Sequence, residues 1–190
     1  MPDRRDAVQL LEEWVDNENL RTHMRAVEAS VRHYARKRGA DEELWGLAGL
    51  LHDLDWEKYP EEHPLKAVEE LERQGYPKDV TRAILAHRSD FTGVEPESEL
   101  DRVLIACDEL SGLVYACCLV RPNGIDDLKP KSVVKKLKDK AFAAGVDRDE
   151  VARGMELIGL ERNEHIQNVI DGMREQAEEL GIRGQDVGRG

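Results

Sequence analysis

Apolar side chains recur at intervals of three and four residues along almost the whole chain, and this spacing restricts the fold more than any other feature. Such a period places the apolar side chains on one face of an α-helix. No window shows the sustained alternation of polar and apolar residues that marks a half-buried strand. A length of 190 residues suits one domain better than two. The sequence therefore predicts an all-α fold, a single-domain helical bundle.

Capping residues indicate where the first helices begin and end. One helix should run from about Asn19 to Gly39, because glycine suits the left-handed position that follows a helix. Asp41 is a candidate N-cap for the next helix, and Ser98 is one for a later helix. Pro64 suits the start of a short helix between them. These boundaries predict several helices joined by short loops.

The second half of the chain begins with a predicted connection at 121–130, where turn formers and charged residues suggest an exposed loop. Two or three helices should follow between Ser132 and about Leu180, with a break at Gly145. The predicted organisation has an N-terminal helix packed on the core at 1–18, a helical core at 19–120, C-terminal helices of the same domain at 121–182, and a disordered tail at 183–190.

Composition limits the classes of partner and the compartment. The formal net charge is -12, which disfavours binding to a nucleic acid polymer because like charges repel. The three cysteines, Cys107, Cys117 and Cys118, form no CxxC pair, and a reducing cytoplasm is the simplest compartment for them. No apolar stretch reaches the roughly 18 residues that span a membrane. We expect a cytoplasmic protein without membrane contact and leave its oligomeric state open.

Several ionisable side chains fall on helix faces that should be buried. His23 lies beside the apolar stripe of its helix, and Asp108 should point into the core. Burial of such groups costs several kcal/mol unless they are paired, hydrogen-bonded or bound to a metal. Neighbouring helical side chains diverge by about 100°, so His52 and Asp53 can flank one cation from the edge of a helix face. Imidazole and carboxylate ligands together suit Mn, Fe, Co, Ni or Zn.

The order of these residues, with His23 first, the His52-Asp53 pair next and Asp108 last, resembles the H…HD…D signature of the HD-domain metal-dependent phosphohydrolase superfamily. The phrases LAGLLHDLDWEK, EEHPLKA and AILAHR look like those of the HDIG-type subgroup of predicted hydrolases. The resemblance covers about residues 19–120. It implies that this segment is an HD-type metal-binding core and that His23, His52, Asp53 and Asp108 are ligands of one divalent transition metal.

The same resemblance concerns a second ion. In two-metal members, histidines placed like His63 and His87 bind the second ion, and the aspartate of the HD pair bridges the two. We expect one ion and leave open whether His63 and His87 hold another or one of them contacts phosphate. The implied reaction is hydrolysis of a small phosphorylated metabolite or nucleotide by a metal-bound hydroxide, because a metal lowers the pKa of its water and offsets phosphoryl charge.

Two residues are candidates for catalysis and three for phosphate binding. Asp55, close to His52 in the chain, is a candidate for an outer hydrogen bond or a general base. His87 is the second candidate catalytic residue. Leu54, Asp55 and Trp56 depart from the common HD-x-G-K form, so a lysine contact with phosphate is not expected there. The candidate phosphate-binding residues are Arg121, Lys131 and Lys138. The two lysines belong to a lysine-rich run at 129–140, and Arg121 precedes it. The alternative interpretation of this run is a solvent-exposed helix face.

Two alternative functions stay open at this point. Some two-metal HD proteins use an iron pair to activate oxygen, which makes a di-iron oxygenase the second hypothesis. The third is a noncatalytic sensor or adaptor in which the metal only stabilises the fold. Three further residues are expected to lie outside the site: His33 and His165 as solvated side chains, and Trp56 as a packing residue.

Overall fold

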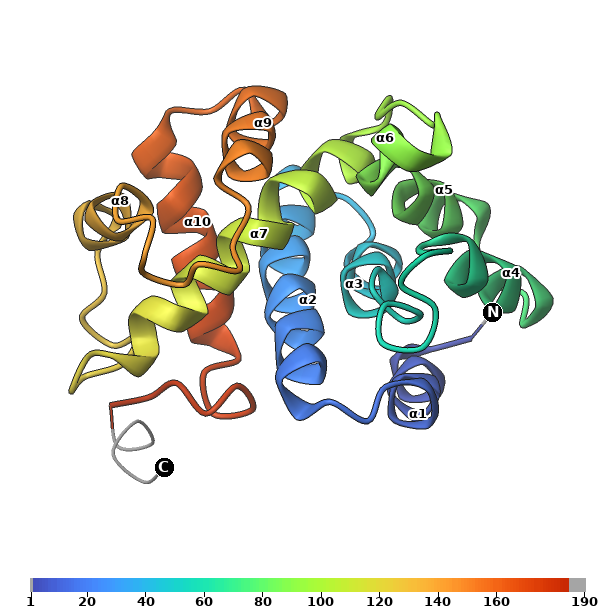
Figure 1. The fold of residues 1–190 in the computed structure, drawn as a ribbon, viewed down its shortest axis with the longest axis horizontal. Coiled ribbons are helices and arrows are strands. Elements are labelled where there is room, and N and C mark those ends of the chain that lie inside the picture. The colour runs from blue at the N-terminus through green and yellow to red at the C-terminus, as the bar shows by residue number, and fades with distance from the viewer. Residues whose placement is uncertain (1, 185–190) are drawn as a thin grey trace.

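The computed structural model describes residues 2–184, and within them the chain forms ten helices and no strand (Figure 1). The helices are α1 (Arg4–Trp14), α2 (Glu18–Arg38), α3 (Glu42–Leu51), α4 (Leu65–Arg73), α5 (Lys78–His87), α6 (Ser89–Thr92), α7 (Glu99–Leu119), α8 (Pro130–Leu137), α9 (Arg148–Ile158) and α10 (Arg162–Glu175). The predicted all-α single-domain fold is confirmed. None of the helices in the described part of the chain has both the length and the apolar character needed to cross a bilayer.

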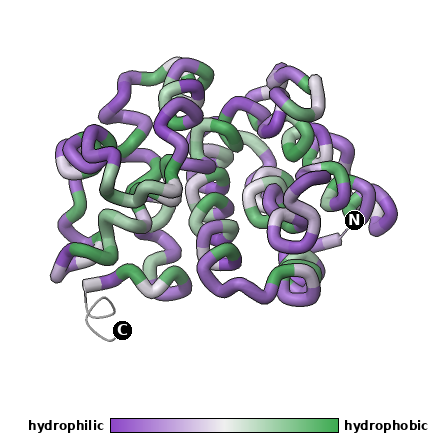
Figure 2. Tube along the Cα trace, in the orientation of Figure 1, coloured by the Kyte–Doolittle hydropathy of each residue, from purple (hydrophilic) through white to green (hydrophobic). Residues whose placement is uncertain are grey.

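Helices α2 and α7 occupy the middle of the molecule, with α1 and α3 to α6 on one side and α8 to α10 on the other (Figure 1). Apolar and polar segments alternate along the long helices in Figure 2, as amphipathic packing requires. The apolar faces of α2 and α7 meet those of α3, α5, α9 and α10 in one continuous core. Its fully buried side chains include Met24, Leu50, Leu51, Leu104 and Leu110.

The predicted helix ends agree with the structure. Gly39 follows α2 with a φ of 65°, in the left-handed region. The Asp41 side chain accepts a hydrogen bond from the amide of Leu44 at 3.0 Å and thereby caps α3. Ser98 caps α7. Of the two or three helices predicted between Ser132 and about Leu180, the structure has three, which begin at Pro130 and end at Glu175.

Close packing of α3 on α2 brings the first histidine near the second. At Gly49 of α3, a Cβ atom would lie only 2.8 Å from the Cα atom of Glu28 on α2. The absence of a side chain at Gly49 therefore allows the two backbones to touch. His23 on α2 and His52, the residue after α3, are consequently neighbours, with ring centroids 5.3 Å apart.

The connection at 121–130 is less exposed than the sequence suggests. Ile125 and Leu128 are fully buried, and the amide of Ile125 donates to the carbonyl oxygen of Ile182 at 2.9 Å. Pro122 and Asn123 are exposed, but Gly124 and Ile125 are buried against the chain after α10. Arg183 pairs with Asp126 at 2.9 Å, and residues 185–190 of the predicted tail lie outside the described residues.

His165 and His33 are not solvated, contrary to the expectation from their polar neighbours. His165 is fully buried; its Nε2–H donates to the carbonyl oxygen of Ala106 at 2.9 Å, and its Nδ1 accepts from the Tyr34 hydroxyl at 2.6 Å. Nδ1 of His33 forms a hydrogen bond with Oε1 of Glu175 at 2.9 Å. Both rings join α10 to α2 or α7, a tertiary contact that the local sequence does not signal.

We expect the buried His165 to make the fold sensitive to acid. Burial lowers the pKa of His165 to about 4 from an ordinary value near 6.5. The folded chain therefore binds fewer protons than the unfolded chain between these values, and the free energy of unfolding falls as the pH falls through this window. The full loss is about 3 kcal/mol. Urea unfolding at pH 7 and pH 4.5 should show a smaller pH effect for His165→Gln than for the wild type; equal effects would refute the assignment.

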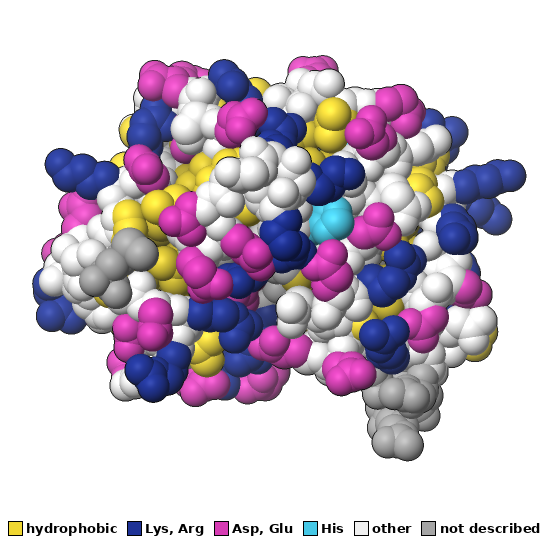
Figure 3. Space-filling view, turned by 180° about the vertical axis from the view of Figure 1, so that it is seen from behind, with side chains coloured by type: hydrophobic (Ala, Val, Ile, Leu, Met, Phe, Trp, Pro, Cys, Tyr) yellow, Lys and Arg dark blue, Asp and Glu magenta, His cyan; other side chains and the backbone are white. Residues whose placement is uncertain are grey.

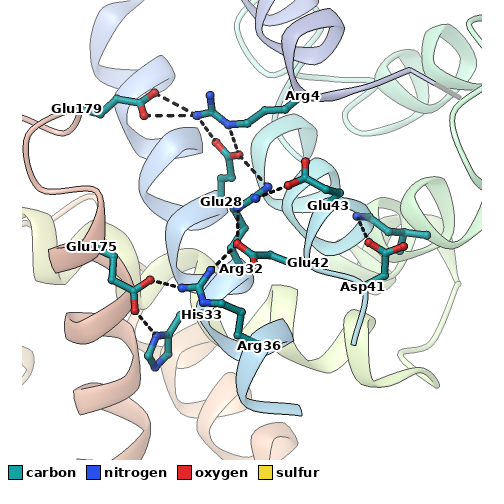
Figure 4. A network of polar contacts seen from close by, with 11 residues as sticks. Arg4, Glu28, Arg32, His33, Arg36, Asp41, Glu42, Glu43, Glu175 and Glu179 are labelled. Carbon is teal, nitrogen blue, oxygen red and sulfur yellow. Dashed lines mark hydrogen bonds and ion pairs between the residues drawn. The ribbon is translucent and has the colours of Figure 1, made fainter. Parts of the chain in front are cut away.

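Ion pairs join the outer faces of the helices (Figure 4). Glu28 on α2 is buried, and the guanidinium of Arg4 on α1 donates to it at 2.6 Å. Arg32 on α2 donates to Glu42 on α3 at 3.1 Å. The face opposite to Figure 1 carries interspersed acidic and basic side chains (Figure 3).

Candidate metal centre

The first cluster joins three helices at one point. His23 comes from α2, His52 and Asp53 follow directly on α3, and Asp108 comes from α7; their ligand atoms lie within 4.8 Å of one another. Nε2 of His23 is 3.0 Å from Oδ1 of Asp108 and 3.7 Å from Oδ2 of Asp53. Nε2 of His52 is 3.2 Å and 3.3 Å from the same two oxygen atoms. The structure thus brings together the four residues that the signature singles out.

A second cluster shares Asp53 with the first. It consists of Asp53, His63 and His87, with His63 in the segment before α4 and His87 at the end of α5. Oδ1 of Asp53 lies 3.3 Å from Nε2 of His63 and 3.6 Å from Nε2 of His87. Its other oxygen, Oδ2, faces the first cluster. The Asp53 carboxylate therefore lies between two groups of histidines, with one oxygen toward each.

Hydrogen bonds on the far side of the rings fix which nitrogen faces the clusters. His52 and His87 each donate from Nδ1–H to the carbonyl oxygen three residues earlier, at 2.8 Å and 2.5 Å. His63 donates from Nδ1–H to Oδ1 of Asp55 at 2.6 Å. A neutral imidazole that donates from Nδ1 keeps a lone pair on Nε2. All three rings therefore present lone pairs to the interior of the clusters.

This arrangement concentrates electron pairs that need a cation between them. The Nε2 atoms of His63 and His87 face each other at 3.2 Å. Nε2 of the fully buried His52 has no hydrogen-bond partner, because its contacts with Asp53 and Asp108 lack hydrogen-bond geometry. Lone pairs and carboxylates at such distances repel unless positive charge lies among them. The nitrogen and oxygen donors fit a divalent transition metal.

The electrostatics of the first cluster indicate what replaces a metal in its absence. Burial alone would lower the pKa of His52, but the carboxylates of Asp53 and Asp108 raise it well above its ordinary value. Burial alone would raise the pKa of the two carboxyls, but the His52 cation holds both well below their usual range. These shifts favour a proton on His52 when no metal lies between the carboxylates and the ring.

Metal binding is consequently expected to release about one proton at pH 7, because a ligating histidine must be neutral. Affinity should fall as the pH falls, since protons then compete better for His52. Calorimetric titration of the metal-free protein with Mn²⁺, in buffers of different ionisation enthalpy, measures the proton count. Heats that do not depend on the buffer would contradict this prediction, and His52→Gln serves as the control that releases none.

Both clusters border a cavity of about 600 Å³. Five of the cluster residues line it, so space for a substrate adjoins the candidate ligands. Outside the clusters most of the charged residues in the lining are acidic. Its charged members are Arg88, Asp90, Glu109, Asp147 and Glu150, and its apolar members are Leu20, Trp56, Ile105 and Val146.

The chain after α8 supplies one wall of this cavity. The carboxylate of Glu109 on α7 accepts a hydrogen bond from the amide of Asp147 at 2.9 Å and ties this wall to the residue next to Asp108. The guanidinium of Arg148 donates to several carbonyl oxygens of residues 139–146 and fixes the loop before α9. Burial and the Asp108 charge raise the pKa of Glu109 to about 7.

Asp55 contacts a histidine of the second cluster. It is fully buried and does not line the cavity. One oxygen accepts from Nδ1–H of His63 and the other from the amide of Ala67 at 2.8 Å. These contacts match the outer hydrogen bond of the two predicted alternatives, and the general-base role of Asp55 stays a prediction. The other candidate catalytic residue, His87, lies in the second cluster.

The predicted phosphate-binding residues do not reach the centre. Arg121, Lys131 and Lys138 are absent from the cavity lining. Arg121 pairs with Asp127 at 2.7 Å, and the two lysines are exposed at α8. Local charge could not reveal that α8 packs on the far side of α10 and α7. The cation that lines the cavity in the described part of the chain is Arg88.

Residues missed by the sequence analysis include Arg88, Trp56 and the acidic residues of the cavity. Arg88 follows His87, a candidate ligand of the second ion, and Glu109 follows the signature residue Asp108, so this adjacency was an available signal. Asp147 and Glu150 carried none, because only tertiary packing brings α9 to the site. Trp56 packs edge-on against His63, with ring centroids 5.1 Å apart, but it is 45% exposed and lines the cavity. Part of its ring is therefore accessible from the cavity rather than packed in the core.

Comparison with known families agrees with this geometry. The family model of the HD domain matches residues 20–113. The chain belongs to the HD-domain superfamily. The match confirms the resemblance and contains every residue of the two clusters, whereas α8 to α10 lie beyond it. The superfamily consists largely of metal-dependent phosphohydrolases. No curated protein and no solved structure matches the chain.

Proposed function

We propose that this HD-domain protein is a metal-dependent phosphohydrolase that acts on a small phosphorylated metabolite or nucleotide. The observation that carries the proposal is the carboxylate of Asp53, which lies between two histidine clusters beside an open cavity. Phosphoryl transfer requires positive charge around the phosphoryl oxygens and an activated water. Both requirements are met by a pair of divalent cations a few ångströms apart.

His23, His52, Asp53 and Asp108 would hold the first ion, and Asp53, His63 and His87 would hold the second, so Asp53 belongs to both ligand sets. When bound, these ions supply Lewis acidity toward a phosphoryl oxygen and a lower pKa for water. The protein residues orient the ligands and line the cavity in which the substrate would bind.

Outer hydrogen bonds keep these ligands in place. Asp55 holds His63 with Nε2 directed inward, and backbone carbonyls do the same for His52 and His87. Leu20, Ile105 and Val146 line the cavity with apolar surface, which limits the water around the reacting groups. Because the cavity is open, a substrate has room beside the ions, and this supports an enzyme over a sensor in which the metal only stabilises the fold.

A metal-supplemented activity screen tests the proposal. Protein prepared without chelator and loaded in turn with Mn, Fe, Co, Ni or Zn is incubated with phosphomonoesters and nucleotides, in air and under nitrogen. We expect phosphate release with at least one metal, unchanged under nitrogen and lost after chelation. If no metal in the screen supports phosphate release, the proposal is contradicted. Turnover only with iron and oxygen would favour the di-iron oxygenase.

A further inference from the structure

Positive side chains are scarce around the cavity. Carboxylates from α6, α7 and α9 line it together with those of the clusters, and they repel an anionic substrate. Among the lysines and arginines of the described residues, Arg88 is the one that lines this cavity. It follows His87 directly, so it stands next to a proposed ligand of the second ion. Arg88 is therefore suited to contact an anionic group beside the second cluster.

The backbone of Arg88 is fixed where α5 turns into α6. Its amide donates to the carbonyl oxygen of Leu85 at 3.2 Å. Its own carbonyl oxygen accepts from the amides of Phe91 and Thr92 at 3.0 Å and 2.9 Å. The Thr92 hydroxyl closes the corner with a hydrogen bond to Leu85 at 2.8 Å. These bonds hold the Cα atom of Arg88 in a constant position relative to His87.

The side chain of Arg88 is oriented by one carboxylate. Nε and Nη2 donate to the two oxygens of Asp90 at 3.1 Å and 3.2 Å, which leaves the N–H groups of Nη1 for another acceptor. Glu150, another cavity carboxylate, is paired with Arg153 at 3.2 Å, and Arg153 also donates to Ser89 at 2.6 Å. Because Glu150 is paired with Arg153, Asp90 is the carboxylate that holds the Arg88 side chain.

We propose that Arg88 binds the phosphoryl group of the substrate, with Asp90 as the residue that positions its guanidinium. This inference rests on the proposed phosphohydrolase function and adds the residue that recognises the anion. A guanidinium can keep two N–H groups on a carboxylate and offer a third to a phosphoryl oxygen. A lysine ammonium, a compact charge on a flexible stem, does not reproduce this geometry.

Direct binding of inorganic phosphate tests the proposal without reliance on turnover. Calorimetry is done on Mn²⁺-loaded protein, with metal content checked by elemental analysis. Arg88→Met should weaken phosphate binding roughly 10- to 100-fold, the range for loss of hydrogen bonds to a charged group. Arg88→Lys should recover part of the loss, and Asp90→Asn should have a smaller effect. Arg73→Met is the matched control, because Arg73 makes an equivalent fork with Glu70 on α4, away from the cavity.

Kinetics with 4-nitrophenyl phosphate separate this proposal from the wider one. Arg88→Met should raise KM by a similar factor while metal content stays unchanged. Equal phosphate affinity in the wild type and Arg88→Met, or no phosphate binding by the loaded wild type, would overturn the role of Arg88. Phosphate binding that depends on Arg88, without hydrolysis of any ester, would instead leave this role intact and refute the phosphohydrolase function.

Discussion

Replacement of Asp53 by alanine is expected to remove both bound ions and to abolish activity. Its two oxygens face different clusters, so one substitution takes a ligand from each. The histidines of the two clusters then lose the negative charge that lies between them. Substitution of a residue that only hydrogen-bonds to a metal ligand lowers metal affinity or activity roughly 10- to 100-fold. Loss of a ligand itself should therefore lower activity more than roughly 100-fold. Elemental analysis and the phosphatase assay measure the two effects on the same preparation.

The matched control is Asp16→Ala, which removes an exposed carboxylate between α1 and α2. It should keep the metal content and activity of the wild type. Circular dichroism confirms that Asp53→Ala still folds as a helical protein. A folded Asp53→Ala variant that retains both ions, or full activity, would show that Asp53 does not bridge the clusters.

Gly49→Ala should be the most destabilising single-methyl change near the site. The added Cβ would lie 2.8 Å from the Cα atom of Glu28, and a backbone atom cannot move away by a side-chain rotation. Overpacking of this kind costs about 1–3 kcal/mol. We expect a loss of about 2 kcal/mol in the free energy of unfolding, even though alanine favours the helix. Because α3 must move away from α2, His52 and His23 separate and Mn²⁺ affinity should fall roughly 10-fold.

A second glycine provides the control for this prediction. Gly112 also lies within a helix, α7, but a Cβ there would meet its nearest neighbours at 3.8 Å, an ordinary contact distance. Gly112→Ala should therefore raise the free energy of unfolding by up to about 1 kcal/mol through helix propensity. Urea denaturation of both variants decides the matter. A Gly49→Ala protein as stable as Gly112→Ala would contradict the close approach of α2 and α3.

The sequence was sufficient where local rules decide the structure. Helix caps such as Asp41 and Ser98, and the left-handed Gly39, follow from neighbours in the chain, and these boundaries agree with the structure. The four signature residues were also located, because their order along the chain resembles the family signature. The structure places their ligand atoms within 4.8 Å of one another.

Long-range packing accounts for what the sequence did not reveal. The burial of His165 depends on its contacts with Tyr34 and Ala106, far away in the chain. The lysines of α8 lie in a conspicuous basic run, yet their helix packs away from the cavity. Arg88 stands alone among acidic residues and was overlooked for this reason. Charge density along the sequence therefore pointed to α8 and not to Arg88, the residue that we propose for phosphate binding.

Anomalous diffraction from crystals grown with Mn²⁺ tests the two-ion centre most directly. We predict two peaks, one among His23, His52, Asp53 and Asp108 and the other among Asp53, His63 and His87, with Asp53 bound to both. A Mn²⁺ ion bound elsewhere, or crystals in which both clusters stay empty at saturating Mn²⁺, would contradict the account.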